Sequence, residues 1–279
     1  DGNDGAATVS IIGTDIAENA LTNPNSSFRS LMRLDNTHPT FTLLSPDSSE
    51  YVNHTLVGYK LSETSFSGTI TWTRVGGTAD ANSPHTSSLT EDELDQATTF
   101  IDHTLTNVPT NLVSGTNYSL TWSATDSAGN ISSNFVSTPV YYDTTAPTAV
   151  LTYSHYFASE DTVVIITATF NERALPTPQI AIDYQGVGDD IAATNMSIGT
   201  DSTIWTYDAT IPAGEGNNDI ATVTLTSTDL ALNALRVADV ANSDTLEVDN
   251  TFPTASISYT DSLTKENDEV DITVTFSEE

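Results

Sequence analysis

Acidic side chains recur at matched positions along the chain, and their types suit one kind of chemistry. The phrase D-x-T-x-P-T occurs three times, at intervals of 108 and 106 residues, with its aspartate at Asp35, Asp143 and Asp249. The phrases KLSE, TFNE and TFSE place a glutamate at Glu63, Glu172 and Glu278. Carboxylate oxygens are the ligands that Ca²⁺ prefers. The recurrence therefore predicts a cation site in each repeat.

A third phrase adds carboxylate and amide oxygens to the same set. It reads TDSAGN at 125–130, TDLALN at 228–233 and TDIAEN at 14–19, always with an Ala two positions and an Asn four positions after the Asp. The candidate ligands that it supplies are Asp126, Asn130, Asp229 and Asn233. The same phrase also suits a tight turn, because Asp and Asn accept hydrogen bonds from nearby amides. Both interpretations stay open at this point.

The segments between these phrases have the alternation of β-strands. In YSLTWSATD, one face carries Tyr118, Leu120, Trp122 and Ala124. In VDITVTF, we expect an inward face made by Val270, Ile272, Val274 and Phe276. Such a period of two in β-forming residues predicts half-buried strands. Long helical periods are not found, although 88–100 has the composition for a short turn of helix.

About seven short strands per hundred residues predict a two-sheet sandwich of the immunoglobulin (Ig) kind. The stretch GTNYSLTW places Tyr118 at the start of the penultimate strand, as in a tyrosine corner, and Trp72 stands where strand C carries a core tryptophan. We therefore interpret Trp72, Trp122 and Trp205 as core residues.

The fold brings the acidic phrases together. In an Ig sandwich, strand A starts at the pole where strand B ends and where the F–G turn lies. Asp35, Glu63 and Asp126 with Asn130 are therefore predicted to converge at one pole of the first repeat. The second repeat places its own residues in the same way, and the third does so in part.

The phrases D-T-T-A-P at 143–147 and D-x-A-G-N at 126–130 resemble the tandem Ig-like repeats of very large bacterial surface and secreted proteins. The resemblance covers essentially the whole chain and implies architecture more than function. The Asp-Asn of LDNTHP and VDNTFP is similar to the linker of cadherin junctions, which implies calcium between domains. Residues 143–145 are Asp-Thr-Thr, so this junction lacks the linker Asn.

The phrases also divide the chain. We expect an all-β, elongated array of Ig-like sandwiches whose terminal domains are incomplete. Residues 35–142 and 143–248 would be two domains of different types. Residues 1–34 would be strands F and G of one truncated domain, because 2–15 aligns with 216–229 without a gap. Residues 249–279 would be strands A and B of another, because 250–279 aligns with 144–173.

Composition excludes several classes of partner and activity. Seven basic against 38 acidic residues give a net charge of −31, which repels nucleic acid and anionic membranes. The sequence contains no cysteine, which suits an exported prokaryotic protein that does not rely on disulfides. Its apolar runs are too short to span a bilayer, so we expect no membrane insertion of this segment. The histidines are scattered and no catalytic motif appears, so we assign no catalytic residues and expect no enzyme.

These observations predict a structural or adhesive segment of an extracellular or cell-surface protein, such as a stalk, an adhesin shaft or a surface fibre. Calcium would stiffen the junctions between neighbouring Ig-like domains of the same chain. Other copies in a fibre, or a surface glycan or protein, are further possible partners. Two alternatives remain: a glycan- or protein-binding module, and spacer domains attached to a secreted enzyme.

Overall fold

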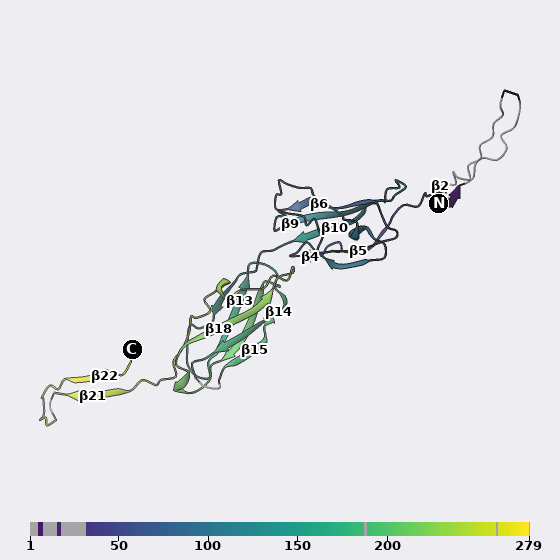
Figure 1. The fold of residues 1–279 in the computed structure, drawn as a ribbon. Helices are drawn as coiled ribbons and strands as arrows, with labels where there is room; N and C mark the ends of the chain where they lie inside the picture. The colour runs from purple at the N-terminus through teal and green to yellow at the C-terminus, as the bar shows by residue number, and fades with distance from the viewer. Residues whose placement is uncertain (1–4, 8–15, 18–31, 187–188, 261, 279) are drawn as a thin grey trace. The chain divides into compact units, whose positions relative to one another are not determined.

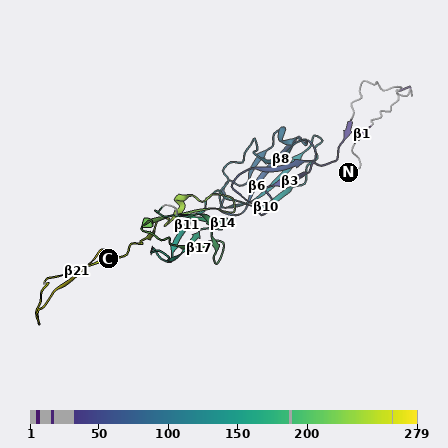
Figure 2. The ribbon, with the colours of Figure 1, turned by 90° about the horizontal axis from the view of Figure 1, so that it is seen from below.

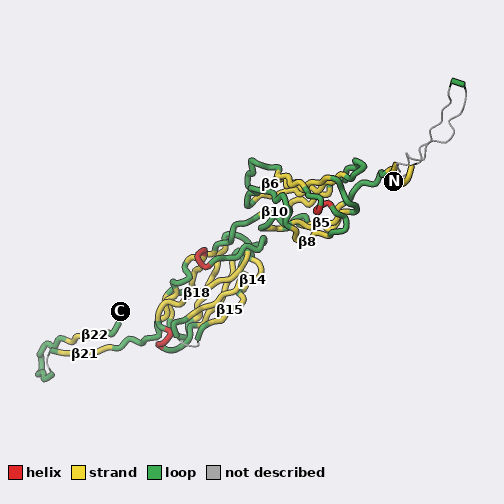
Figure 3. Tube along the Cα trace, viewed as in Figure 1, coloured by secondary structure: helices red, strands yellow, loops and turns green. Residues whose placement is uncertain are grey.

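The computed structural model describes residues 5–7, 16–17, 32–186, 189–260 and 262–278. These residues are almost entirely strands and loops, and their helical elements are short 3-10 turns (Figure 3). The chain forms two units, Asp1–Thr145 with Ala231–Asn233, and Ala146–Leu230 with Ala234–Glu279. Each unit contains one β-sandwich with a core of its own.

The first sandwich has one sheet of five strands in the order β4-β10-β9-β6-β7 and one of three in the order β3-β5-β8 (Figure 1). Its strands are β3 (Phe41–Ser45), β4 (Tyr51–Val52), β5 (Val57–Leu61), β6 (Ser67–Gly77), β7 (His85–Ser88), β8 (Thr99–His103), β9 (Thr116–Thr125) and β10 (Phe135–Tyr142). In Ig terms these sheets are A′GFCC′ and ABE. The short helical turn expected in 88–100 is the 3-10 turn η2 (Asp92–Leu94).

The second sandwich repeats this order with two sheets of five strands, β16-β17-β13-β11-β19 and β12-β20-β18-β14-β15 (Figure 2). Its strands are β11 (Ala149–Tyr153), β12 (Phe157–Ala158), β13 (Val163–Phe170), β14 (Leu175–Asp183), β15 (Ile191–Asn195), β16 (Ser197–Ile198), β17 (Ile204–Thr210), β18 (Asp219–Thr228), β19 (Val240–Ala241) and β20 (Leu246–Val248). Two 3-10 turns, η3 (Glu215–Asn217) and η4 (Val237–Asp239), lie in its loops. The strand order of both sandwiches confirms the Ig-like, all-β prediction.

The alternation in the sequence becomes burial in the sandwiches. Along β9, buried and half-buried residues alternate without a break, and Tyr118, Leu120 and Trp122 are fully buried. Trp72 is also fully buried and packs edge-on against Tyr118, with 5.8 Å between the ring centroids. Trp205 in the second sandwich is 6% exposed. The tryptophans are therefore core residues, as predicted.

Two strand pairs lie outside the sandwiches. Near the N-terminus, β1 (Gly5–Ala7) pairs with β2 (Met32–Leu34), and near the C-terminus, β21 (Ala255–Tyr259) pairs with β22 (Ile272–Phe276), both antiparallel. The sequence predicts an inward face for β22, but Ile272, Val274 and Phe276 are exposed. The reason is that no second sheet in the described residues packs over this ribbon.

The tyrosine corner of the first sandwich is extended by a buried carboxylate. The Tyr118 hydroxyl accepts a hydrogen bond from the Val113 amide at 3.0 Å and donates one to Asp80 Oδ2 at 2.7 Å. The Nε2 atom of His85 lies 2.6 Å from the same oxygen. The hydrogen bond from Tyr118 lowers the pKa of Asp80 most, and burial raises it. The hydrogen bonds from His85 and from the Asn82 amide lower it further, so the pKa falls to about 2.

This network predicts a pH-dependent part of the stability. A carboxyl with a lowered pKa stabilises the fold above its unfolded pKa and loses that contribution as the pH falls through its folded pKa. Replacing Asp80 with Asn should therefore cost about 2 kcal/mol of unfolding free energy near pH 7. The difference from the wild type should shrink between about pH 4 and pH 2, the window between the two pKa values. Urea unfolding across this pH range measures it, and a difference that does not change with pH would contradict the role of Asp80.

Candidate metal centre

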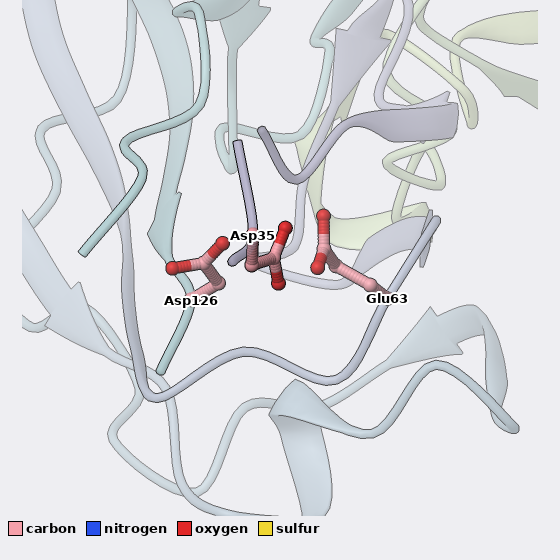
Figure 4. A group of neighbouring side chains, drawn as sticks. All are labelled: Asp35, Glu63 and Asp126. Atoms are coloured by element: carbon pink, nitrogen blue, oxygen red, sulfur yellow. The ribbon is translucent and has the colours of Figure 1, made fainter. Parts of the chain in front are cut away.

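Three separate elements of the first unit bring carboxylates to one place. Asp35 directly follows β2, Glu63 lies two residues after the end of β5, and Asp126 directly follows β9. Each offers one carboxylate oxygen, and these oxygens all lie within 4.8 Å of one another. In Figure 4 the Asp35 side chain lies between those of Asp126 and Glu63. The predicted convergence of these three residues is therefore observed.

The aspartate before each strand A is fixed by a turn that it makes with its own backbone. In every repeat, its Oδ1 accepts a hydrogen bond from the amide two residues further on, at 2.9 to 3.0 Å. The three donor–acceptor pairs are Thr37 to Asp35, Thr145 to Asp143, and Thr251 to Asp249. Such Asx turns set the direction of the carboxylate before strand A begins. This turn does not compete with a role of the aspartate in the cluster, because it uses Oδ1 as an acceptor and leaves Oδ2 for other contacts.

A side chain next to each glutamate ties strand A to the end of strand B. The residue before the glutamate accepts a hydrogen bond from the amide of the threonine that follows the linker proline, at 2.7 to 2.9 Å. The three pairs are Thr40 to Ser62, Thr148 to Asn171, and Thr254 to Ser277. In return, the amide of Ser62, Asn171 or Ser277 donates to the carbonyl of the same threonine. The glutamate is therefore held one residue from a fixed point on strand A.

Asp126 is the buried member of the cluster, with 3% of its surface exposed. Its Oδ1 accepts hydrogen bonds from the amides of Ala128 and Asn130, each at 2.8 Å, and its Oδ2 accepts one from the Asn130 side chain at 2.7 Å. Burial opposes ionisation of Asp126, but the hydrogen bonds from Asn130, Ala128 and Gly129 outweigh burial and hold the pKa of this carboxyl below its ordinary value. The carboxylate is therefore charged at neutral pH.

Asn130 organises the cluster through its amide nitrogen. Besides Asp126, its Nδ2 donates to the carbonyl oxygen of Asp35 at 3.0 Å, which joins the F–G turn to the linker. Asn233 makes the same contact in the second repeat, where its Nδ2 donates to the carbonyl of Asp143 at 2.9 Å. The recurring TD phrase predicts that both asparagines are oxygen ligands, and that role stays a prediction.

The other repeats show which parts of the arrangement recur. Asp143, Glu172 and Asp229 also offer carboxylate oxygens within 4.8 Å of one another. Asp249 keeps the Asx turn with Thr251, and Thr254 keeps its hydrogen bond to Ser277, the residue before Glu278. In the part of the chain described here, no third carboxylate is grouped with Asp249 and Glu278. Asp15 and Asn19 of the first TD phrase lie outside the described residues.

Some of the organising residues carry no signal that sequence analysis could have used. Ser62 and Ser277 are serines whereas Asn171 is an asparagine, and serine is common throughout this chain, so their shared role emerges only from the hydrogen bonds. Ser114 is a second such residue, because its hydroxyl donates to Asp143 Oδ1 and accepts from the Thr144 amide, each at 2.9 Å.

Electrostatics make the cluster costly without a positive charge. Two unit charges 4 Å apart repel by about 1 kcal/mol in water and by about 4 kcal/mol near a protein surface. A divalent cation with oxygen ligands is the partner whose chemistry fits three converging carboxylates.

Comparisons with known proteins find a similar solved structure but no matching family. No protein-family model matches the chain. No curated protein matches it. Among solved structures, the chain is similar to the fibronectin(III)-like modules of Clostridium thermocellum CbhA, with 16% identity, coverage of 72% of this chain and 92% of that one, and a TM-score of 0.33. The fold assignment therefore rests on the strand order given above.

The described residues also contain no helix with the length and apolar character needed to cross a bilayer.

The hydrogen bonds of Asp126 predict a structural role that is separate from any metal. In chelator, replacing Asp126 with Asn should lower the unfolding free energy of the first sandwich by about 1.5 to 3 kcal/mol, because the new amide group faces the Asn130 donor and the charge-assisted bonds are lost. Urea unfolding followed by tryptophan fluorescence in a Trp205→Phe background reports this sandwich alone. The matched Asp102→Asn change, at an exposed position on β8, should leave stability within about 0.5 kcal/mol. Equal effects of the two changes would refute the role of Asp126.

Proposed function

We propose that this chain is a structural segment of an extracellular array of Ig-like repeats, and that Ca²⁺ held by the acidic cluster stiffens the start of each repeat. The observation that carries this proposal is the convergence of Asp35, Glu63 and Asp126, from a linker, a strand end and a turn, within 4.8 Å. The recurrence of the three residue types in the second repeat supports it.

The ligand set suits calcium better than smaller or softer ions. It consists of carboxylate oxygens, with the amide oxygens of Asn130 and Asn233 as further candidates, and the described residues of the cluster include no histidine. Ca²⁺ takes six to eight such oxygens at 2.3 to 2.6 Å in flexible geometry, whereas Mg²⁺ requires a near-ideal octahedron. A cation there would bind to a linker residue and to two loops of the following sandwich at once.

The stiffening follows from where these ligands sit. Asp35 belongs to the segment that leads into strand A, and Pro39 already restricts the residue before it to extended conformations. A cation that joins Asp35 to Glu63 and Asp126 removes the remaining freedom of this segment. The charge of −31 keeps the surface solvated, and the Ig-like sandwiches then act as spacers of fixed length.

Calcium should therefore stabilise the first sandwich. At a hundredfold excess of free Ca²⁺ over its dissociation constant, linkage adds about 2.7 kcal/mol to the unfolding free energy. For a domain of about 100 residues, this corresponds to a rise in Tm of roughly 10 °C or more relative to the protein in EGTA. Differential scanning calorimetry at matched ionic strength measures the rise, and an equal Tm in both buffers would refute the proposal.

Glu63→Gln separates specific binding from general screening of charge. Glutamine keeps the size of the side chain but removes one negative ligand, so the calcium-dependent rise in Tm of the first sandwich should largely disappear. The control, Glu247→Gln on β20, removes the same charge from an exposed position and should keep the full rise. If the two variants respond alike, the cluster is not the binding site.

A further inference from the structure

A hollow lies on the outer face of the second sandwich, where strand β14 bulges against its neighbour β18. Leu175 of β14 pairs with Thr228 of β18, and the next pair is Gln179 with Thr226. Three residues of β14 therefore stand opposite Ser227 alone, and extra residues of this kind interrupt the ladder and bend the strand. The hollow has a volume of about 520 Å³, within the range of about 300 to 1,000 Å³ that is usual for ligand sites. Its lining consists of Pro176, Thr177, Gln179, Asn195, Thr226, Ser227 and Thr228.

The first sandwich pairs the corresponding strands without such a bulge. In the strand order, β6 and β9 stand where β14 and β18 stand in the second sandwich. The two ends are comparable, because Thr125 of β9 and Thr228 of β18 both open the TD phrase. From Ser67 with Thr125 to Arg74 with Tyr118, the pairing of β6 with β9 has no register shift. The bulge beside the TD phrase is therefore a property of the second sandwich and not of the Ig-like strand order.

The lining offers hydrogen-bonding groups rather than an apolar surface. Four of its residues carry hydroxyl groups and two carry amides. Gln179 Nε2 donates to Asn195 Oδ1 at 3.2 Å, which leaves Gln179 Oε1 as an acceptor and Asn195 Nδ2 as a donor. Both side chains are exposed. A ligand in the hollow therefore meets an acceptor and a donor from one amide pair, together with hydroxyls that can act as either.

The strand register places three of these groups in a row. Asn195 of β15 pairs with Gln179 of β14, which in turn pairs with Thr226 of β18. Their side chains lie on the outer face, because the neighbouring Ile180 and Leu225 belong to the core. Adjacent strands are about 4.8 Å apart, so the row presents polar groups at regular intervals. Such a row is complementary to an extended ligand that carries polar groups along its length.

Charge and polarity decide the class of ligand. The chain carries a net charge of −31, which repels anions, yet none of the residues that line the hollow is charged. A cation would therefore find no carboxylate among these lining residues. An apolar ligand would cover the hydroxyls and amides without replacing their hydrogen bonds to water, which costs free energy. The remaining class is a neutral ligand rich in groups that both donate and accept hydrogen bonds.

We propose that this hollow binds a neutral saccharide chain along the row Asn195–Gln179–Thr226. Each sugar hydroxyl donates and accepts, so it can pair with the amide groups and with the hydroxyls of Thr177 and Thr226. Pro176 adds an apolar surface for the C–H groups of a sugar ring. The site uses none of the carboxylates of the acidic cluster, so it goes beyond the proposed calcium-dependent stiffening and does not depend on it. The second sandwich is then a spacer that also contacts glycans.

The test is an NMR titration of the full chain in EGTA with uncharged oligosaccharides. The probes are maltohexaose, cellohexaose, xylohexaose, mannohexaose and N-acetylated chitohexaose, and a neutral glycine-serine peptide serves as the other kind of occupant. At least one saccharide should shift the side-chain amide signals of Gln179 and Asn195, because these groups exchange water for ligand. The proposal is overturned if no saccharide shifts these signals, or if only the peptide does.

Two variants locate the binding on the hollow. Gln179→Ala removes a member of the amide pair and should weaken binding of the active saccharide about tenfold or more. Thr226→Val keeps the shape of the side chain, removes its hydroxyl and should weaken binding several-fold. The matched control is Gln96→Ala, at an exposed position of the first sandwich, and it should leave the affinity unchanged. Equal affinities of Gln179→Ala and Gln96→Ala would place the saccharide elsewhere and overturn the proposal.

Discussion

The arrangement at the start of each repeat depends on one constraint, the tie between the first residues of strand A and the last residues of strand B. Two hydrogen bonds between Thr40 and Ser62 form this tie in the first repeat, and Thr148 with Asn171 and Thr254 with Ser277 form it in the others. Because the glutamate is the next residue and the linker aspartate stands five positions before the threonine, the tie brings two carboxylates together. The cluster is thus a consequence of strand pairing.

The third carboxylate, that of Asp126, is held in a different way from that of Asp35. Asp126 is buried, and its hydrogen bonds come from its own turn, so it is charged and fixed whatever happens at the linker. Asp35 is exposed and belongs to the segment that a cation would immobilise. The proposed cation would thus bind between a buried acceptor and an exposed one, and the conformational entropy lost on binding would be that of the linker segment.

The two sandwiches share a strand order but hold their outgoing linkers with different chemistry. In the first, the Ser114 hydroxyl contacts Asp143 Oδ1 and the Thr144 amide. In the second, Asn250 is buried, its side-chain nitrogen donates to the carbonyls of Pro212 and Gly214, and its amide donates to Asn218 Oδ1. The Asn of the VDNTFPT phrase therefore binds the linker to the preceding E–F loop, while its Asp belongs to the acidic pattern. In the Asp-Thr-Thr phrase, the corresponding backbone amide, that of Thr144, donates to the Ser114 hydroxyl instead of to an asparagine.

The sequence alone determined the strands, the repeats and the convergence of Asp35, Glu63 and Asp126, because alternation of apolar residues and spacing of turn phrases are local properties that the Ig-like strand order converts into positions. Only the tertiary structure decided which polar residues hold the site. The roles of Ser62 and Ser114 come from partners distant in sequence, and nothing in their own neighbourhood marks them. It also decided burial: the alternation in VDITVTF predicts an apolar face, but whether that face is covered depends on a second sheet, which no local pattern encodes.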